Sequence, residues 1–201
     1  GKGELKVKLF RIQHQLFAES QKELTKAEYK RLVLAAGKKK NKRLYYIIQT
    51  LGATGIRVSE LAYITVDAVE AGMADISMKG KERTILISKK LKQLLTTWIK
   101  QEAIQSGPVF VTRNGRPVNR SNICHEMKKL CHAAEVDPVK VFPHNLRHLF
   151  VRCFYSINKD IGRLADILGH SCIETTRIYI SVSSHQFEKI FSDMNMVIFV
   201  K

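Results

Sequence analysis

The sequence predicts an α+β domain that is mainly helical and carries one small antiparallel β-sheet. Apolar residues recur at helical spacing along most of the 201 residues, which is the pattern of helices that bury one face. Over residues 74–87 the pattern changes to the apolar and polar alternation of two strands. Hydrophobic residues make up 45% of the chain, so it can bury a core and is not a disordered basic tail.

The first helices are predicted from the residues that begin and end them and from their apolar spacing. Residues 1–24 lack a sustained pattern and are interpreted as a linker or extension. Thr25-Lys-Ala-Glu28 is a capping box, so it opens a helix, which Gly37 ends. A second helix is predicted over 42–54 and a short one over 58–62.

The hairpin turns at Lys79-Gly80-Lys81, where glycine supplies the turn geometry. Ser88 is expected to cap a helix that runs to Gln105, with Gly107-Pro108 as its stop. The elements predicted beyond it are a short strand over 109–111, helices over 121–134, 144–156, 160–168, 175–179 and 184–193, and an apolar tail over 194–200.

Positive charge is the strongest feature of the composition. The chain has 34 lysines and arginines against 18 acidic residues, and the net charge of +16 indicates a polyanionic partner. Residues 1–50 alone hold 13 of these basic residues and 4 of the acidic ones. A basic run after Gly37 is either a solvated loop between helices or a loop that contacts phosphates. Its members are Lys38, Lys39, Lys40, Lys42 and Arg43.

Membrane and secreted proteins are poor matches to this sequence. It contains no run of about 18 uncharged apolar residues, and its first residues do not resemble a signal peptide. The 4 cysteines are scattered and form no CxxC pair, which is typical of free thiols in a reducing cytosol.

The candidate reactive groups are basic, and no carboxylate cluster accompanies them. Metal-dependent phosphoryl transfer needs several Asp or Glu ligands for Mg²⁺, so this pattern argues against it. A cationic pocket can instead neutralise a phosphodiester, because arginine donates to two phosphate oxygens at once. A tyrosine is then a candidate nucleophile, with lysine as proton donor and histidine as proton acceptor.

Three segments resemble, in order and spacing, the three signature boxes of the tyrosine recombinase/integrase family. Their amino-acid sequences are similar to those of the boxes of bacterial Xer-like recombinases and of conjugative-transposon and phage integrases. The resemblance covers residues 24–181 and implies the catalytic-domain fold of that family. The segments are Thr54-Gly-Ile-Arg57-Val-Ser-Glu60-Leu61, His144-Asn-Leu-Arg147-His148, and Leu168-Gly169-His170-Ser-Cys-Ile-Glu-Thr-Thr-Arg-Ile-Tyr179.

The resemblance implies roles for single residues. Arg57 and Arg147 match the two arginines that bind the scissile phosphate. His144 matches the proton acceptor near the nucleophile, and His170 matches the family's His or Trp that hydrogen-bonds the phosphate. Tyr179 matches the nucleophile, which forms a 3′-phosphotyrosine with DNA. The family needs no cofactor and no metal.

The lysine of the hairpin remains open between two residues. The family's common pattern is Gly-Lys-Gly-x-Lys-x-Arg, whereas this chain has Met78-Lys79-Gly80-Lys81-Glu82-Arg83, one residue shorter. Lys79 resembles the lysine that protonates the 5′-hydroxyl leaving group, and Lys81 is the alternative.

Two further residues are expected to support the site. Glu60 is expected to hold a neighbouring backbone group or arginine, and His148 to be buried and hydrogen-bonded. His144 and His148 also have the spacing of zinc ligands on a helix, but no motif supplies a third ligand, so no metal is predicted. Besides the basic run after Gly37, the predicted DNA contacts are Lys81, Arg83, Arg113, Arg116 and Arg120.

The resemblance implies a site-specific DNA recombinase or integrase that cuts and rejoins strands through a covalent tyrosine. The alternatives are a type IB-like topoisomerase and a catalytically silent DNA-binding module. The implied partners are a double-stranded DNA recombination site and further protomers, of this protein or a related recombinase, in a tetramer. The expected location is the bacterial cytoplasm at the nucleoid, with no membrane partner.

Three parts are expected along the chain. Residues 1–24 form the interdomain linker, residues 25–182 the catalytic domain, and residues 183–201 a C-terminal helix and tail. The family's N-terminal core-binding domain is not expected in this sequence. The tail either closes its own core or is exchanged between neighbouring protomers, and exchange is favoured.

Overall fold

The computed structural model describes residues 2–4, 6–7, 22–78, 80–159 and 185–200. Helices dominate this part of the chain, together with a two-stranded antiparallel sheet. The predicted class, a mainly helical α+β domain with a small antiparallel sheet, is confirmed. The predicted helices over 160–168 and 175–179 lie outside the described residues. No helix among the described residues is long and apolar enough to span a bilayer.

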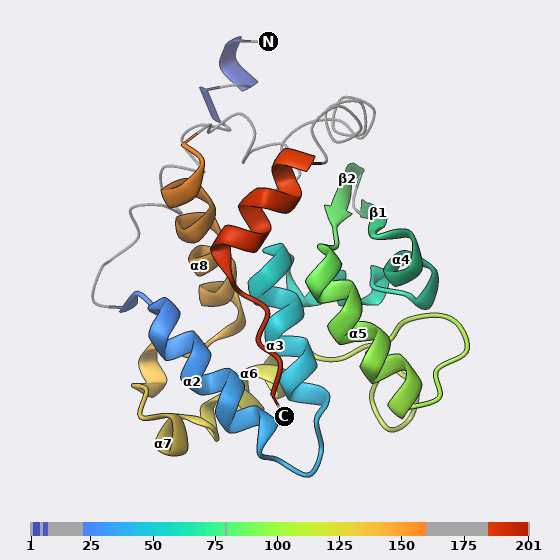
Figure 1. Ribbon diagram of the computed structural model, residues 1–201, viewed down its shortest axis with the longest axis vertical. Coiled ribbons are helices and arrows are strands. Elements are labelled where there is room, and N and C mark those ends of the chain that lie inside the picture. Colours follow the sequence, from blue (N-terminus) through green and yellow to red (C-terminus); the bar gives the residue numbers. More distant parts are fainter. Residues whose placement is uncertain (1, 5, 8–21, 79, 160–184, 201) are drawn as a thin grey trace.

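One helix occupies the centre of the described part. In Figure 1, α3 (Arg43–Thr54) lies between the other long helices. Its residues from 45 to 54 are all buried, which requires neighbours on every side. These neighbours are α2 (Lys26–Gly37), α5 (Lys89–Gln101), α6 (Arg120–Lys128) and α8 (Pro143–Ile157).

Helices α2 and α3 begin and end close to the predicted residues. The Thr25 hydroxyl accepts the N–H of Glu28 at 3.1 Å, and the Glu28 carboxylate accepts the N–H of Thr25 at 3.0 Å. Helix α3 ends at Gly55, whose φ of 72° is in the left-handed region that glycine adopts without strain. Both ends are therefore determined by local sequence.

The hairpin forms as predicted. A short helix that the sequence pattern did not reveal precedes it. The 3₁₀ helix η2 (Val58–Tyr63) leads to α4 (Val66–Ala71), which is too short for a periodic pattern. Strands β1 (Met73–Met78) and β2 (Lys81–Leu86) then pair in antiparallel register.

Helix α5 is shorter than predicted. Ser88 caps it as expected, but the helix ends at Gln101 and not near residue 105. Ala103 has a φ of 51°, and the N–H of Ile104 returns to the carbonyl of Ile99 at 3.0 Å. A left-handed residue followed by such a bond ends a helix, and here it does so without a glycine.

The strand predicted over 109–111 is wrong. Two isolated bridges stand there instead, one between Thr65 and Pro108 and one between Val111 and Pro117. Proline has no N–H to donate, so neither bridge extends into a ladder.

The single helix predicted over 121–134, with Ser121 as its first residue, is two helices, and the first begins at Arg120. Asn119 caps α6, because its Oδ1 accepts the N–H groups of Ser121 at 2.8 Å and Asn122 at 3.2 Å. The second helix is α7 (Cys131–Ala134). After η3 (Pro138–Lys140), α8 agrees with the helix predicted over 144–156.

The end of the described chain lies along α2 and α3 (Figure 1). Residues 185–194 are helical, as predicted, and the residues after them are extended. The hydroxyls of Tyr29 and Tyr45 donate to the carbonyls of Met196 and Ile198, each at 2.7 Å. In this single chain the tail closes its own core, and its exchange between protomers stays a prediction.

Candidate active site

Arg57 lies in the turn that joins α3 to η2. Glu60 Oε1 accepts the backbone N–H of Arg57 at 2.8 Å, which closes this turn. The Arg57 side chain is 49% exposed, and its Nη1 lies 3.8 Å from the same carboxylate oxygen. That distance is an ion pair but too long for a hydrogen bond, so the Arg57 guanidinium can reorient toward a ligand.

Arg147 reaches the same turn from α8. Its side chain is 1% exposed, and its Nη1 donates to the carbonyl oxygen of Gly55. A Cβ on Gly55 would lie 2.5 Å from Cδ1 of the Phe150 ring, so glycine permits this close approach of the turn to α8. The two arginines predicted from separate boxes therefore meet where α3 ends.

A third arginine comes from β2. Arg83 is 5% exposed, and its Nη2 donates to Glu60 Oε1 at 2.7 Å. It is paired with Ile76 across the hairpin and lies on the same face as Ile85, and both isoleucines are buried. The sequence predicts Arg83 as a DNA contact, whereas the structure buries it beside Glu60. The period-two pattern of the strand could have revealed this.

The three guanidinium groups interact unfavourably with one another. Burial, followed by the charges of Arg57 and Arg83, lowers the pKa of Arg147 to about 9, and Glu60 acts in the opposite direction. Burial also lowers the pKa of Arg83, partly offset by Glu60. Positive charge is thus costly here, and an anion bound among these groups would offset that cost.

His144 lies at the start of α8, beside these arginines. Burial, followed by the charges of Arg147, Arg57 and Arg120, lowers the pKa of its imidazole from the ordinary 6.5. His144 is therefore neutral at pH 7 and able to accept a proton. Its ring contacts His148 edge to face, with 4.6 Å between the centroids.

Several predicted site residues are not covered by this geometry. Lys79, His170 and Tyr179 lie outside the described residues, and the side chain of Lys81 is not described either. Within the described ranges, no three His, Cys, Asp or Glu side chains are grouped so that they could hold a metal ion.

The arginines predicted to contact DNA lie in different places. Arg120 is the first residue of α6, and its charge acts on His144, so it adjoins the site. Arg113 and Arg116 are exposed on the loop before α6.

A second basic region surrounds the N-terminal end of α3. A helix of 12 residues is about 18 Å long, so this region lies about that far from the arginines at the C-terminal end. Arg43 is engaged there: its Nη1 donates to the carbonyl of Val111 at 2.9 Å, and its Nη2 lies 3.5 Å from Glu126. Lys42 Nζ donates to the carbonyl of Gly37. Lys38 and Lys39 are exposed.

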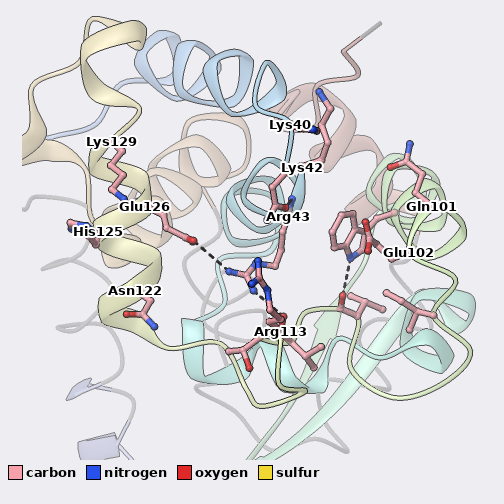
Figure 2. A pocket seen from close by; sticks show the side chains of 16 residues that line it. Lys40, Lys42, Arg43, Gln101, Glu102, Arg113, Asn122, His125, Glu126 and Lys129 are labelled. Atoms are coloured by element: carbon pink, nitrogen blue, oxygen red, sulfur yellow. Dashed lines mark hydrogen bonds and ion pairs between the residues drawn. The ribbon is translucent and has the colours of Figure 1, made fainter.

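This region borders a cleft of about 980 Å³ (Figure 2). Figure 2 shows Arg43 between Glu126 and the loop that carries Arg113. The acidic side chains that line the cleft are Glu102 and Glu126. The basic side chains outnumber them and are Lys40, Lys42, Arg43, Arg113, His125 and Lys129.

The comparison with protein families decides what kind of domain carries this site. The sequence model of the phage integrase family matches residues 22–186, which include all three boxes and the hairpin. The chain belongs to this family. The tyrosine recombinase XerD of Staphylococcus haemolyticus (strain JCSC1435) is 30% identical over 158 residues, 74% of this chain and 53% of XerD. The chain spans about half the length of the curated relatives it matches.

Solved recombinases share the fold of this phage integrase family member. The crystal structure of XerA recombinase has a TM-score of 0.61 at 24% identity, over 86% of this chain and 63% of XerA. XerH bound to its difH substrate in a pre-cleavage complex has a TM-score of 0.61 at 21% identity, over 84% of this chain and 53% of XerH. The helical fold with its small hairpin is thus that of tyrosine recombinase catalytic domains.

Proposed function

We propose that this chain is the catalytic domain of a site-specific DNA recombinase or integrase, which cleaves and rejoins strands through a covalent bond to Tyr179. One observation carries the proposal: Arg57 and Arg83 pair with the carboxylate of Glu60, the buried Arg147 lies close enough for their charges to lower its pKa, and a neutral His144 lies beside them. Membership of the phage integrase family and the likeness of the fold to XerH, which was solved bound to its difH substrate, support it.

The charge of this cluster of arginines and Glu60 suits an in-line displacement at phosphorus. A phosphodiester carries one negative charge, and attack by a tyrosine phenol that gives up its proton to a base adds a second in the transition state. Three guanidinium groups and one carboxylate have a net charge of +2, which matches the transition state better than the ground state. Because Arg83 and Arg147 are buried and already held in place, little reorganisation of these two groups is needed as the charge develops.

The proposed reaction conserves the number of phosphodiester bonds. The phenol oxygen of Tyr179 attacks phosphorus, and His144 accepts the phenol proton. The bond from phosphorus to the 5′ oxygen breaks, and Lys79, or its alternative Lys81, gives that oxygen a proton. Joining is the reverse, with the 5′-hydroxyl of a partner strand as nucleophile. Arg57 and Arg147 bind the non-bridging oxygens, and His170 hydrogen-bonds the phosphate.

The remaining basic residues are proposed to hold the duplex. Arg120 adjoins the site, while the basic run after Gly37, with Arg113 and Arg116, would contact phosphates further away. We further propose that the protein acts as a tetramer on its DNA site, with exchange of the 194–200 tail between protomers. Residues 25–182 are proposed as the catalytic domain, working at the nucleoid in the cytoplasm.

A covalent capture experiment tests the proposal without knowledge of the target site. The protein is incubated with a library of nicked suicide duplexes that have randomised half-sites, and adducts are isolated under denaturing conditions. We expect adducts for the native protein and none for Tyr179→Phe. A silent DNA-binding module would bind the duplexes but give no adduct, and this outcome would overturn the proposal.

A second assay separates recombinase from topoisomerase. With a captured site placed on two duplexes, a recombinase transfers strands between them. A type IB-like topoisomerase relaxes a supercoiled plasmid but leaves the two duplexes unexchanged.

A further inference from the structure

We propose that Arg83 is a positioning residue that keeps the carboxylate of Glu60 from closing on the guanidinium of Arg57, so that Arg57 is free to bind phosphate. The inference deepens the proposed function and rests on it. It concerns a residue that the resemblance to the family does not place in the catalytic set.

The geometry of Glu60 is the starting point. Its Oε1 accepts two short hydrogen bonds, from Arg83 Nη2 at 2.7 Å and from the backbone N–H of Arg57 at 2.8 Å. The Arg57 guanidinium is 3.8 Å from the same oxygen. Two arginines therefore compete for one carboxylate, and Arg83 is the one that holds it.

The two arginines differ in how far they are fixed. The side chains of Arg83 and Glu60 are each 6% exposed, and Arg83 is held by strand β2. The Arg57 side chain is 49% exposed and can move. A buried carboxylate needs a cation, because an unpaired charge in a poorly solvated site is costly. Without Arg83, the guanidinium of Arg57 is the cation that a small rotation brings onto Glu60.

Such a rotation would harm catalysis in two ways. It would turn the Arg57 guanidinium from the phosphate toward the buried carboxylate of Glu60. It would also neutralise that guanidinium by a full ion pair with Glu60, so that less positive charge faces the phosphate. Arg83 thus acts on the reaction through Glu60 and Arg57, and it needs no contact with DNA.

The competing explanation is that Arg83 only stabilises the fold by tying β2 to η2. Both explanations predict that Arg83→Met slows cleavage, so this variant alone does not separate them. They differ when the carboxylate is also removed. If Glu60 is what captures Arg57, then Glu60→Gln should restore activity to Arg83→Met. If Arg83 is merely structural, a second change in the same pair should restore nothing.

The experiment measures the single-turnover rate of Tyr179 adduct formation with DNA already bound. For Arg83→Met we expect a loss of about a hundredfold, similar to losing one donor to the transition state. For the double variant Arg83→Met/Glu60→Gln we expect recovery of at least about tenfold, because the Gln side-chain oxygen still accepts the N–H of Arg57 but carries no charge. Glu60→Gln alone is measured beside the double variant, so that the effect of removing the carboxylate is separated from the effect of removing Arg83.

The chain offers a matched control in another Arg–Glu pair. Arg152 Nε lies 3.3 Å from Glu23, and neither residue is part of the site. Arg152→Met and Arg152→Met/Glu23→Gln should show no such loss and recovery in the cleavage rate. Thermal unfolding of every variant checks that it is folded, and Arg83→Lys, which keeps the charge, should lie between the native protein and Arg83→Met.

Two results would overturn the inference. One is a double variant that is folded yet no faster than Arg83→Met. The other is an Arg83→Met variant that cleaves at the native rate. A calorimetric titration with inorganic phosphate in the Tyr179→Phe background gives a readout that does not depend on the tyrosine. If the native protein forms no adduct, the proposed function fails, while the phosphate affinities still test whether Arg83 frees Arg57.

Discussion

The two ends of helix α3 carry two basic regions of the described chain, and they hold their charge in different ways. At the N-terminal end, Arg43 lies between a backbone carbonyl and the carboxylate of Glu126, and the lysines before it face solvent. At the C-terminal end, Arg83 is buried and pairs with the same carboxylate as the half-exposed Arg57, and the buried Arg147 donates to the carbonyl of Gly55.

The difference shows that the density of positive charge along a sequence does not identify the strongest anion site. Two charges 4 Å apart interact by about 1 kcal/mol in water but by about 4 kcal/mol near a protein surface of lower effective dielectric. The lysines at the first end are screened by water and salt. The arginines at the second end are not, so a bound phosphate is stabilised more strongly there.

The largest expected effect is the loss of cleavage rate when Arg147 is replaced. Replacing it by methionine keeps much of the side-chain volume but removes both its charge and its bond to Gly55. We expect the rate of adduct formation to fall by about a thousandfold, since preorganised charge at the transition state is lost. Rapid-quench assays with saturating protein measure this rate. A loss below tenfold would contradict the contrast between the two ends.

The next largest effect is the pH dependence that His144 gives to the stability of the protein and to the cleavage rate. Its pKa is below the ordinary 6.5, so the folded protein resists the proton that the unfolded chain accepts. As the pH falls below 6.5, both the stability of the free protein and the cleavage rate should therefore decrease. Bound phosphate offsets the neighbouring arginine charges, so the inflection for the DNA complex should lie at higher pH than for the free protein.

Unfolding and cleavage measured from pH 8 to pH 5 test this prediction. His144→Gln should remove the slope in stability. A native protein that becomes more stable as the pH falls would contradict the pKa shift.

A substitution at Gly55 tests how closely the end of α3 must pack against α8. Gly55→Ala should lower the free energy of unfolding by about 2 to 4 kcal/mol, because alanine is strained at a φ of 72° and its Cβ would collide with the Phe150 ring. Gly72→Ala is the matched control, since Gly72 has a φ of 78° but its nearest neighbour is 3.7 Å away. It should cost about 1 kcal/mol, the strain alone. Chemical denaturation gives both values, and equal losses would show that the collision with Phe150 is unimportant.

The smallest effects are expected in the second basic region. Lys40→Ala and Arg113→Ala should each weaken DNA binding a few-fold at low salt and reduce the slope of log affinity against log salt by about 1. The chemical step in complexes already bound should change far less. Binding titrations at several salt concentrations measure the slope, and unchanged slopes would show that this cleft does not hold the duplex.

The ends of several helices were predictable because they depend on neighbouring residues. The capping box of Thr25 and Glu28 and the left-handed Gly55 act within a few residues of their position. The end of α5 was not predictable, because Ala103 takes a left-handed φ that its own side chain does not favour. The failed strand near Val111 has another cause, since Val111 forms an isolated bridge with Pro117, which has no N–H with which to extend a ladder.

The sequence by itself, through the resemblance of its boxes to those of a known family, predicted that Arg57 and Arg147 bind phosphate and that His144 belongs to the same site. Only the tertiary structure decided how these groups share charge. Arg83 comes from a strand distant from both boxes, and its burial against Glu60 depends on how the hairpin packs on η2. The pKa values of Arg147 and His144 depend on desolvation and on charges brought together by folding, and neither quantity exists in an extended chain.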